Sequence, residues 1–358
     1  MKILTIVGAR PQFVKAATIS RAVSKEAYLR EIIVHTGQHF DANMSEIFFR
    51  EMDIPKPTYN LGISSMSHGA MTGKMLAGIE ELIQKEKPDV LLVYGDTNST
   101  LAGALAARKI HVPVGHVEAG LRSFNMEMPE EVNRILTDRI SDFLYCPTDS
   151  AVANLKGEGF DAFDADVVRT GDVMLDAALF YAEQSTAKSS YREKILKGDF
   201  ALCTLHRAEN TDHKLRMEEI VNGLNAIHRE LPVILPLHPR TKKMLIQHGL
   251  ELDVDLIDPV GYFDMIELLK QASVVLTDSG GLQKEAFFFK TPCVTIRDQT
   301  EWVELVDHGF NILASAHADD ILEKCRAMRS KHLNFGIDLY GSGHAAEDII
   351  AHLKSRLA

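Results

Sequence analysis

The stretch VLLVYGDTNS, residues Val90–Ser99, shows the pattern on which the whole chain is built. Its first half, Val90–Tyr94, is apolar without alternation, which indicates a strand that is covered on both faces. Gly95 and Asp96 follow this strand, and a helical pattern then occupies Ser99–Lys109. A buried strand that leads through a polar loop into a helix is the unit of an α/β fold with a parallel sheet.

The same alternation of strands and helices extends along the chain in both directions. In the first half, the predicted strands are Lys2–Val7, Glu31–Thr36, Val90–Tyr94, Val112–Val117, Phe143–Cys146 and Val167–Thr170. The helices predicted there are Pro11–Ser24, Met44–Met52, Ser67–Glu86, Ser99–Lys109, Pro129–Ser141 and Ser150–Glu158. The pattern restarts with strands at Phe200–Thr204, Val233–Leu237, Val254–Ile257, Val274–Thr277, Cys293–Ile296 and Asn311–Leu313. The helices of this second half are predicted at Arg216–Glu230, Lys242–Gln247, Tyr262–Ala272, Gly281–Phe289 and Asp319–Ser330.

Two doubly wound α/β domains explain this restart best, and a length of 358 residues suits two or three domains. We expect an N-terminal domain over residues 1–170 and a C-terminal domain over residues 171–343, joined near 171–185. The two domains are expected to face each other across a cleft, because the carboxyl ends of parallel strands carry the binding loops. The pattern alone leaves open on which domain the last helix, residues 344–358, packs.

Charge and composition exclude several classes of function. Lys and Arg total 39 against 50 Asp and Glu, a formal net charge of −11, which argues against binding to nucleic acid or an acidic membrane. No run approaches the roughly 18 apolar residues of a membrane span, and the N-terminus resembles a strand more than a signal peptide. The four cysteines lack zinc-ligand spacing and are predicted to be buried free thiols, as expected in a reducing cytoplasm.

The first domain carries carboxylates directly after predicted strands. Asp96 and Glu118 end two strands that are expected to be neighbours, and Glu130 and Glu131 open a helix. Carboxylates that share a cleft shift one another's pKa values and so become candidate general acids and bases. Each also has a structural alternative: Asp96 as a helix N-cap, Glu118 as an ion-pair partner of Arg122, and the two glutamates as first-turn acids favoured by the helix dipole.

The second domain carries a glycine-rich turn instead. Asp278–Gly281 follows a predicted strand and opens a helix, where free backbone N–H groups suit a phosphate, although Ser279 could equally be a plain N-cap. Glu285 lies one turn into this helix, where it either reaches ribose hydroxyls or lies on a solvated face. Among the histidines, His206 is the best placed, because it stands in a loop after a strand and Arg207 follows it.

Several common nucleotide and metal motifs are missing from the sequence. It contains no GxxxxGK[ST], and no GxGxxG follows the first strand, so neither a P-loop nor a nicotinamide site is indicated. The similar string at Gly341–Ala346 follows no strand. The two DxD pairs, residues 164–166 and 253–255, precede strands and are better explained as surface turns than as metal sites.

Seven blocks then occur in a specific combination and order. They are Gly8–Pro11, Thr36–His39, Gly95–Thr97, Gly115–Arg122, Pro129–Arg134, His206–Asn210 and Asp278–Glu285. In this combination the chain resembles the non-hydrolysing UDP-N-acetylglucosamine 2-epimerases, from Gly8 to about Gly309. The resemblance implies a GT-B-like fold of two Rossmann-like domains, a homodimer, and a last helix that packs back on the first domain. It implies a cytoplasmic isomerase of surface-polysaccharide (O-antigen) synthesis that binds a UDP-sugar and needs neither metal nor NAD nor any other cofactor.

The resemblance also implies a mechanism and the residues that carry it. UDP leaves by anti elimination across C1–C2, which gives a 2-acetamidoglucal, and adds back while a proton reaches the opposite face of C2. The residues that match catalytic groups are Asp96, Glu118, Glu130 and His206. The residues expected to bind UDP or the sugar are Arg10, Gln38, His39, Arg122, Arg207, His238, Ser279, Gly280, Gly281, Glu285 and Asp298.

Three departures from the common bacterial pattern bear on substrate and regulation. Ala208 stands where many members have arginine, and residues 40–45 and 300–304 also differ. The sequence therefore leaves open whether UDP-N-acetylglucosamine acts as an allosteric activator. These variants, with Trp302, look closer to the branch that acts on UDP-2,3-diacetamido-2,3-dideoxyglucuronic acid, so two substrates stay open. Alternative functions are a GT-B glycosyltransferase, a hydrolysing 2-epimerase and a non-catalytic nucleotide-sugar sensor.

Overall fold

The computed structural model describes residues 1–38, 54–189 and 198–357. They form two compact units: the first comprises Met1–Leu179 and Asp338–Ala358, and the second comprises Phe180–Ile337. The division lies inside helix α7 (Val173–Lys188), which the sequence analysis treats only as a junction. Asp172 precedes α7, and its carboxylate accepts a hydrogen bond from the Met174 backbone N–H (2.8 Å). An aspartate at this position is a common helix start signal, so the sequence did carry a sign of α7.

The first unit is built on a seven-stranded parallel sheet in the order β3-β2-β1-β4-β5-β6-β7. Its strands are β1 Lys2–Val7, β2 Arg30–His35, β3 Tyr59–Asn60, β4 Val90–Tyr94, β5 Val114–Val117, β6 Phe143–Cys146 and β7 Asp166–Arg169. Its helices are α1 Arg10–Ser24, α3 His68–Glu86, α4 Asn98–Lys109, α5 Pro129–Ile140, α6 Asp149–Gly157, the 3-10 turn η1 Phe160–Ala162, the start of α7, and α15 Ala345–Leu357.

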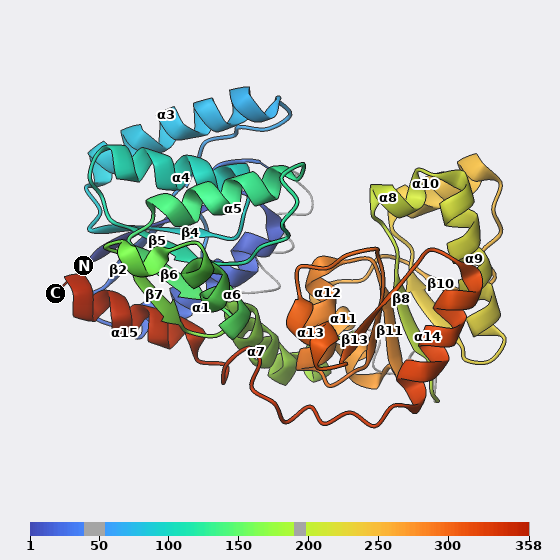
Figure 1. The fold of residues 1–358 in the computed structure, drawn as a ribbon. Coiled ribbons are helices and arrows are strands. Elements are labelled where there is room, and N and C mark those ends of the chain that lie inside the picture. The colour runs from blue at the N-terminus through green and yellow to red at the C-terminus, as the bar shows by residue number, and fades with distance from the viewer. Residues whose placement is uncertain (39–53, 190–197, 358) are drawn as a thin grey trace. The chain divides into compact units, whose positions relative to one another are not determined.

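Helices cover both faces of this sheet. Helices α3, α4 and α5 lie together over one face, where apolar side chains of β1, β2 and β4 meet Met75 and Ile79 of α3 (Figure 1). Helices α1 and α15 contact each other, and the N-terminus of α15 is held by Asp176 of α7, which accepts hydrogen bonds from the Ala345 and Ala346 N–H groups (3.1 and 2.8 Å). The C-terminal helix is thus a part of the first unit.

The second unit has a six-stranded parallel sheet in the order β10-β9-β8-β11-β12-β13. Its strands are β8 Ala201–Thr204, β9 Val233–Pro236, β10 Asp255–Ile257, β11 Val274–Thr277, β12 Cys293–Ile296 and β13 Asn311–Ala314. Its helices are the end of α7, α8 Ala208–Thr211, α9 Lys214–His228, α10 Pro239–His248, α11 Tyr262–Gln271, α12 Gly280–Phe288, α13 Val303–Asp307 and α14 Ala318–Ser330. Two apolar clusters pack against this sheet, one against α9 and α14 and the other against α11 and α12.

The strand predictions are confirmed, with ends that differ by one or two residues. The helix predictions are confirmed to within three residues, except that Met44–Met52 lies outside the described residues. The two-residue edge strand β3 and the short helices α8 and α13 were not predicted from the sequence. Apolar runs identify central strands because both of their faces are covered, whereas a short edge strand has no such run.

The four cysteines are free and buried, as predicted, and burial raises the pKa of each thiol. Among the described residues, we find no helix with the length and hydrophobicity that crossing a membrane requires.

Candidate functional site

Two candidate catalytic carboxylates of the first unit lie at the carboxyl ends of neighbouring strands. Strands β4 and β5 pair in parallel with Tyr94 opposite Val117, and Asp96 and Glu118 follow these ends directly. The structure therefore confirms the expectation that the strands before Asp96 and Glu118 are neighbours. Gly95 turns the chain between β4 and Asp96 with a φ of 62°, which a residue with a Cβ adopts only with strain.

Glu118 is held in an unusual backbone conformation beside a lysine. Its φ is 71°, in the left-handed region that costs a non-glycine residue roughly 1–3 kcal/mol. Its carboxylate forms an ion pair with Lys15 of α1, and the two side chains are only 9% and 10% exposed. The proposed alternative, an ion pair between Glu118 and Arg122, is therefore wrong. Strain of this kind concentrates at functional sites, where the surrounding structure enforces it.

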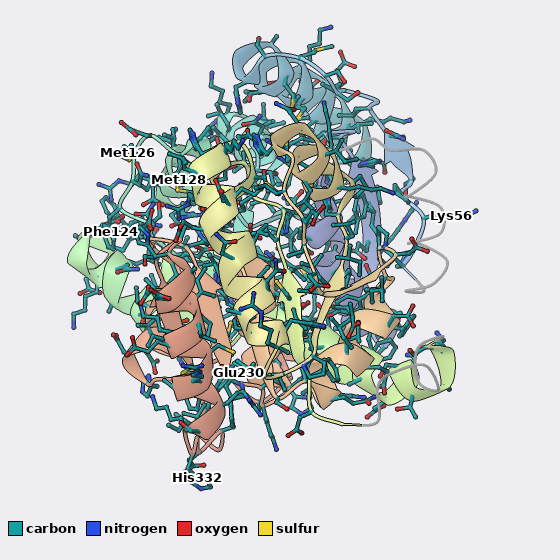
Figure 2. The ribbon with its side chains drawn as sticks, turned by 90° about the vertical axis from the view of Figure 1, so that its right-hand side faces the viewer. Lys56, Phe124, Met126, Met128, Glu230 and His332 are labelled. Atoms are coloured by element: carbon teal, nitrogen blue, oxygen red, sulfur yellow. The ribbon has the colours of Figure 1, made fainter. Side chains whose placement is uncertain are left out.

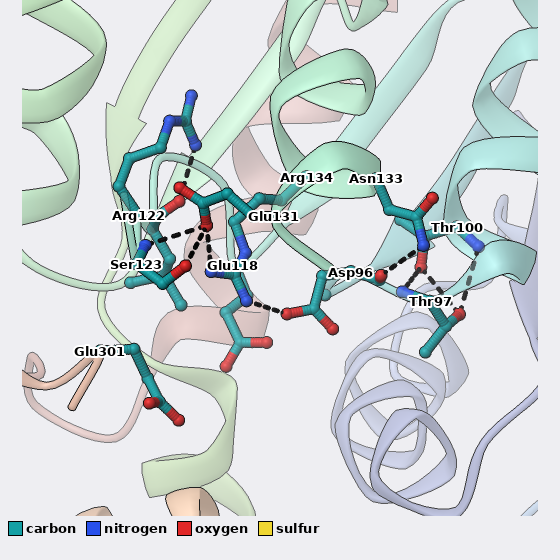
Figure 3. A network of polar contacts seen from close by, with 12 residues as sticks. Asp96, Thr97, Thr100, Glu118, Arg122, Ser123, Glu131, Asn133, Arg134 and Glu301 are labelled. Carbon is teal, nitrogen blue, oxygen red and sulfur yellow. Dashed lines mark hydrogen bonds and ion pairs between the residues drawn. The ribbon is translucent and has the colours of Figure 1, made fainter. Parts of the chain in front are cut away.

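Asp96 is held by a buried arginine of α5. The Arg134 guanidinium forms an ion pair with the Asp96 carboxylate, and the Asn133 side chain donates to the Asp96 carbonyl (2.9 Å) (Figure 3). The carboxylate of Asp96 remains 31% exposed, so one edge of it is open to a ligand. The N-cap of the following helix α4 is Thr97, which accepts from the Thr100 N–H, so Asp96 is not the cap.

The two glutamates that open α5 differ completely in environment. Glu131 is fully buried, and its carboxylate accepts hydrogen bonds from the Ser123 N–H, the Ser123 hydroxyl and the Phe124 N–H, each at 2.9 Å. Although burial works in the opposite direction, these hydrogen bonds and the charge of Arg134 lower the pKa of Glu131. Glu130 is exposed and is therefore the glutamate that a ligand can reach. Glu131 is therefore a structural acid, but its partners are Arg134 and the turn at Ser123, not the helix dipole named in the sequence-based alternative.

The predicted ligand-binding residues of the first unit differ in position and in the partners they already have. Gln38 accepts hydrogen bonds from the Ser99 N–H (3.1 Å) and hydroxyl (2.7 Å) at the start of α4, so it lies at the carboxyl end of the sheet. Arg10 is the first residue of α1, and His39 lies outside the described residues. Arg122 does not fit its predicted role, because its guanidinium is buried and bound to Asp138 (2.7 Å) and Glu158 (2.6 Å). A guanidinium already paired with two carboxylates has little left for a pyrophosphate.

The glycine-rich turn of the second unit opens helix α12, as expected. Ser279 is the N-cap, and its hydroxyl accepts from the Leu282 N–H (3.4 Å). The carbonyl of Gly280 is fixed by the Trp302 indole N–H (2.9 Å), and a Cβ at Gly280 would collide with the Glu301 carboxylate. At Gly281, by contrast, a Cβ would meet no protein atom within 4 Å. The turn thus leaves open space at the N-terminus of α12, where an anion is favoured.

A buried aspartate organises the histidine loop beside this turn. Asp278 is fully buried and accepts hydrogen bonds from the His206 N–H (3.0 Å) and the Arg207 N–H (2.9 Å). It also lies 3.3 Å from His206 Nδ1, and the His206 ring remains 39% exposed. A carboxylate at Nδ1 orients the ring, which then offers Nε2 for hydrogen bonding or proton transfer. The end of the Arg207 side chain lies beside Gly280.

The remaining predicted residues of the second unit lie at varying distance from this turn. The His238 ring is 5.6 Å from that of His206, and partial burial with the nearby charges of His206 and Arg240 lowers its pKa. Glu285 lies on α12 next to Tyr262, whose pKa is raised by burial and by this carboxylate. Asp298 is 71% exposed and forms an ion pair with Arg216 (3.3 Å). Its predicted role in binding the UDP-sugar stays a prediction.

Three residues that hold the site were not identified from the sequence. Arg134 and Asp278 stood in quoted motif blocks, but their neighbours were assigned the roles, and Lys15 stood in none. All three are buried ions beside a candidate site residue. A signal was available for Asp278, because an acidic residue before a phosphate-binding turn is unfavourable unless cations or N–H groups surround it.

The two units present different kinds of chemical group. The first unit presents carboxylates that are suited to proton transfer, and the second presents a histidine, an arginine and a helix N-terminus that are suited to phosphates. Within the described part of the chain, no group of three or more His, Cys, Asp or Glu side chains is arranged to hold a metal ion.

Comparison with known proteins gives a consistent result. A family model described as UDP-N-acetylglucosamine 2-epimerase matches residues 21–354. A UDP-2,3-diacetamido-2,3-dideoxy-D-glucuronate 2-epimerase of Pseudomonas aeruginosa is 58% identical over 354 residues, which cover 99% of each chain. A UDP-N-acetylglucosamine 2-epimerase of Methanocaldococcus jannaschii is 42% identical over 98% of each chain.

Solved structures agree with these sequence matches. The crystal structure of the Methanocaldococcus jannaschii enzyme in complex with UDP-GlcNAc and UDP superposes with a TM-score of 0.89, over 99% of this chain and all of that one. A lipopolysaccharide glycosyltransferase, WaaG, superposes with a TM-score of 0.58 over 98% of this chain and 99% of that one, at 12% identity. The second likeness shows the fold alone, which is GT-B-like.

Proposed function

Because the chain belongs to the UDP-N-acetylglucosamine 2-epimerase family, we propose that it inverts C2 of UDP-2,3-diacetamido-2,3-dideoxy-D-glucuronate. The coarser function is established: the chain is an isomerase, a UDP-sugar 2-epimerase of the non-hydrolysing type. Two observations support the finer substrate. The full-length relative that acts on this uronate is 58% identical, against 42% for a relative that acts on UDP-N-acetylglucosamine. The departures at Ala208, 40–45 and Trp302 point in the same direction.

The reaction is a reversible elimination that moves protons and no redox electrons. A base takes the C2 proton, the C2–H electron pair becomes the C1=C2 double bond, and the C1–O pair leaves with UDP. In the return step a UDP oxygen attacks C1 while an acid protonates C2 on its opposite face. Because neither the elimination nor the return step transfers a hydride, this mechanism calls for no nicotinamide, and the proposed enzyme acts without a cofactor.

In the first unit, we assign proton transfer to Asp96, Glu118 and Glu130. Asp96 and Glu118 follow neighbouring strands, and each is paired with a separate cation, Arg134 and Lys15. Separate cations allow two carboxylates to lie near one sugar without sharing a proton, as an acid and a base on opposite faces require. Glu130 is exposed at the start of α5 and supplies a third group for the same region.

In the second unit, we assign UDP to the turn Ser279–Gly281, with His206 and Arg207 beside it. The helix dipole of α12, the Arg207 guanidinium and His206 all favour the negative charge that develops as UDP departs. Glu285 is placed one turn along α12, where a ribose would follow the phosphates. Gln38, His238, Asp298, Arg10 and His39 remain candidate contacts under this proposal.

The observation that carries the proposal is the pair of carboxylates after β4 and β5, each with its own buried cation. An inverting glycosyltransferase needs one general base, and a nucleotide-sugar sensor needs no carboxylate aimed at the sugar. Two independently charged carboxylates at the ends of adjacent strands suit a reaction that removes a proton from one face and returns it to the other.

We further propose that the active form is a cytoplasmic homodimer. Four buried free thiols favour a reducing compartment. Light scattering on the purified chain tests the dimer, since a monomer at working concentration would remove that part of the proposal.

Proton NMR in heavy water tests the reaction and the substrate together. The enzyme is incubated separately with UDP-2,3-diacetamido-2,3-dideoxy-D-glucuronate and with UDP-N-acetylglucosamine, without added metal or NAD. We expect deuterium at C2 of both epimers of the uronate, at a rate at least tenfold higher than for the second sugar. Faster turnover of UDP-N-acetylglucosamine would overturn the substrate assignment. Net release of free sugar would indicate a hydrolysing enzyme, and consumption only with an acceptor would indicate a glycosyltransferase.

A further inference from the structure

Helix α5 buries a face that is polar throughout. Helices of globular domains usually bury an apolar stripe and expose polar side chains. The residues that α5 (Pro129–Ile140) buries are Glu131, Asn133, Arg134, Thr137 and Asp138. Its Leu136, in contrast, is 47% exposed. Because buried ions cost desolvation energy that an apolar face would avoid, this polar face has a function besides packing.

The first function of this face is to hold the loop after β4. Arg134 pairs with the Asp96 carboxylate, and Asn133 donates to the Asp96 carbonyl (2.9 Å) and to the Asn98 side chain (3.2 Å). Asp96 is therefore fixed at both its backbone and its side chain by adjacent residues of one helix, as Figure 3 shows for Arg134 and Asn133. Burial would lower the pKa of Arg134, but the charges of Asp96 and Glu131 raise it.

The same face also holds the loop after β5, on which Glu118 lies. The Asp138 carboxylate binds His116 Nδ1 (2.6 Å) and accepts from the Gly120 N–H (3.2 Å), so it contacts the chain on both sides of Glu118. The other ring nitrogen of His116 is hydrogen-bonded to the Gly95 carbonyl (2.7 Å), which connects the two loops. One buried carboxylate thus fixes the backbone around Glu118 directly, and through His116 it fixes the carbonyl that precedes Asp96.

Glu131 extends this network to the chain that enters α5. It binds Arg134 (2.6 Å) and clamps Ser123 and Phe124, whose backbone φ of 57° lies in the left-handed region. The segment that follows this turn presents Phe124 (79% exposed) and Met126 (61% exposed) at the surface (Figure 2). A turn with such a φ needs partners that enforce it, and Glu131 is the partner.

We infer that the buried polar face of α5 is the positioning element of the first unit's site, and that Arg134 is its principal residue. Arg134 acts through Asp96: it sets the orientation of the carboxylate and joins it, through Glu131, to the rigid turn at Ser123. This inference rests on the proposed function, because it names the residue that prepares Asp96 for proton transfer at C2. A misplacement of about 1 Å at a reacting group costs roughly a hundredfold in rate.

The test compares Arg134→Gln and Arg134→Lys with Arg139→Gln on the exposed side of the same helix. For Arg134→Gln we expect kcat for C2 exchange to fall about a hundredfold. We expect KM to change by less than about threefold, and the Kd for UDP to stay the same, since UDP is assigned to the second unit. Arg134→Lys should retain more activity than Arg134→Gln because it keeps the charge, although one ammonium replaces the two guanidinium nitrogens that bind Asp96 and Glu131 separately. Added guanidinium should restore part of the activity of Arg134→Gln, and Arg139→Gln should match the unchanged enzyme.

Amide hydrogen exchange supplies a readout that does not depend on turnover. In Arg134→Gln, and in a second variant Asp138→Asn, exchange at residues 95–99 and 118–124 should accelerate, while residues 274–281 of the second unit should not change. Unaltered exchange in the two loops, or an unaltered kcat in Arg134→Gln, would overturn the inference. Absence of C2 exchange in the unchanged enzyme would instead refute the proposed function, and the exchange pattern would still decide the role of α5.

Discussion

In both units the candidate site residues are paired with a buried group of opposite charge, but the signs are reversed between the two units. In the first unit the groups proposed for proton transfer are anions, Asp96 and Glu118, and the buried groups paired with them are cations, Arg134 and Lys15. In the second unit the groups proposed to bind UDP are His206 and Arg207, and the buried group that contacts both of them is an anion, Asp278. Each unit thus fixes its reactive groups with a buried opposite charge, which orients them and offsets their desolvation.

Under the proposed function, the difference between the units follows from the part of the substrate that each one binds. A sugar that gives up and regains a proton needs carboxylates whose charge is controlled separately, and a departing pyrophosphate needs donors and positive charge. The positive groups of the second unit also explain how a chain with a net charge of −11 is suited to an anionic ligand. What the ligand meets is the local arrangement at one strand end, not the sum over the surface.

Removal of the first unit's open carboxylate should have the largest effect. Asp96→Asn leaves the shape of the side chain but removes its ability to take up or deliver a proton, so kcat for C2 deuterium exchange should fall by about 10²–10⁴. Calorimetry should show the same affinity for UDP, which is assigned to the other unit. Asp161→Asn, at an exposed position of the first unit, is the control. A variant that keeps full exchange would show that Asp96 takes no part in proton transfer.

Substitution of Asp278, the buried anion of the second unit, should give the next largest effect, and it should also weaken UDP binding. Asp278→Asn removes the charge at His206 Nδ1 and weakens the hydrogen bonds from the His206 and Arg207 N–H groups. We expect kcat/KM to fall roughly 10–100-fold, as for other groups that orient a reactive imidazole, with weaker binding of UDP. Asp319→Asn, exposed on α14, is the matched control. Equal UDP affinity in Asp278→Asn would separate this aspartate from the phosphate site.

A third comparison concerns stability and pH. The pKa values of Glu131 and Asp138 are depressed in the folded chain, even though burial opposes this. Groups with a depressed pKa stabilise the fold fully above their unfolded values of about 4, and this stabilisation is lost as pH falls through the folded values. At neutral pH, Glu131→Gln should therefore cost about 2 kcal/mol, with a lower Tm. The Tm difference from the unchanged protein should shrink as pH falls below about 4.

Glu127→Gln serves as the control for that series, because Glu127 is exposed in the segment just before α5. A Tm difference between Glu131→Gln and the unchanged protein that stays constant down to pH 3 would contradict the titration argument. The affinity of the second unit for UDP at neutral pH should be the same in both variants.

The smallest effect is expected at the phosphate turn, where two adjacent glycines differ. Gly280→Ala forces its Cβ against Glu301, whose carboxylate is bound to Arg297 (3.0 Å), and should cost about 1 kcal/mol of stability. Gly281→Ala meets no protein atom within 4 Å, so its Tm should be unchanged. Any loss of UDP affinity in Gly281→Ala then reports the approach of the ligand itself. Equal Tm losses in the two variants would contradict the open space described at Gly281.

The central strands and the loops after them could be read from the sequence because each rests on local information. An apolar run such as Leu91–Val93 predicts a covered strand wherever it occurs, and the residues after it must lie at the carboxyl end of a parallel sheet. For the same reason Asp96, Glu118 and the turn at Ser279 were found. The edge strand β3, with two residues, carries no comparable run.

The ion-pair partners of these residues could not be predicted from local sequence. Arg122 stands four residues after Glu118, and sequence proximity suggested a pair, but the fold binds Arg122 to Asp138 and Glu158 and gives Glu118 to Lys15. The two glutamates at the start of α5 are adjacent in the chain, yet one is buried and the other exposed, because they point from different faces of the helix.

The sequence by itself therefore determined the fold class, the positions of the central strands and the residue types offered at their ends. These follow from periodicity and chain order, which act over a few residues. The tertiary structure alone decided which buried charge stands behind each of those residues: Lys15 behind Glu118, Arg134 behind Asp96, and Asp278 behind His206. Such pairs join elements far apart in the chain, and they form only where the low dielectric of the folded interior makes an unpaired charge too costly.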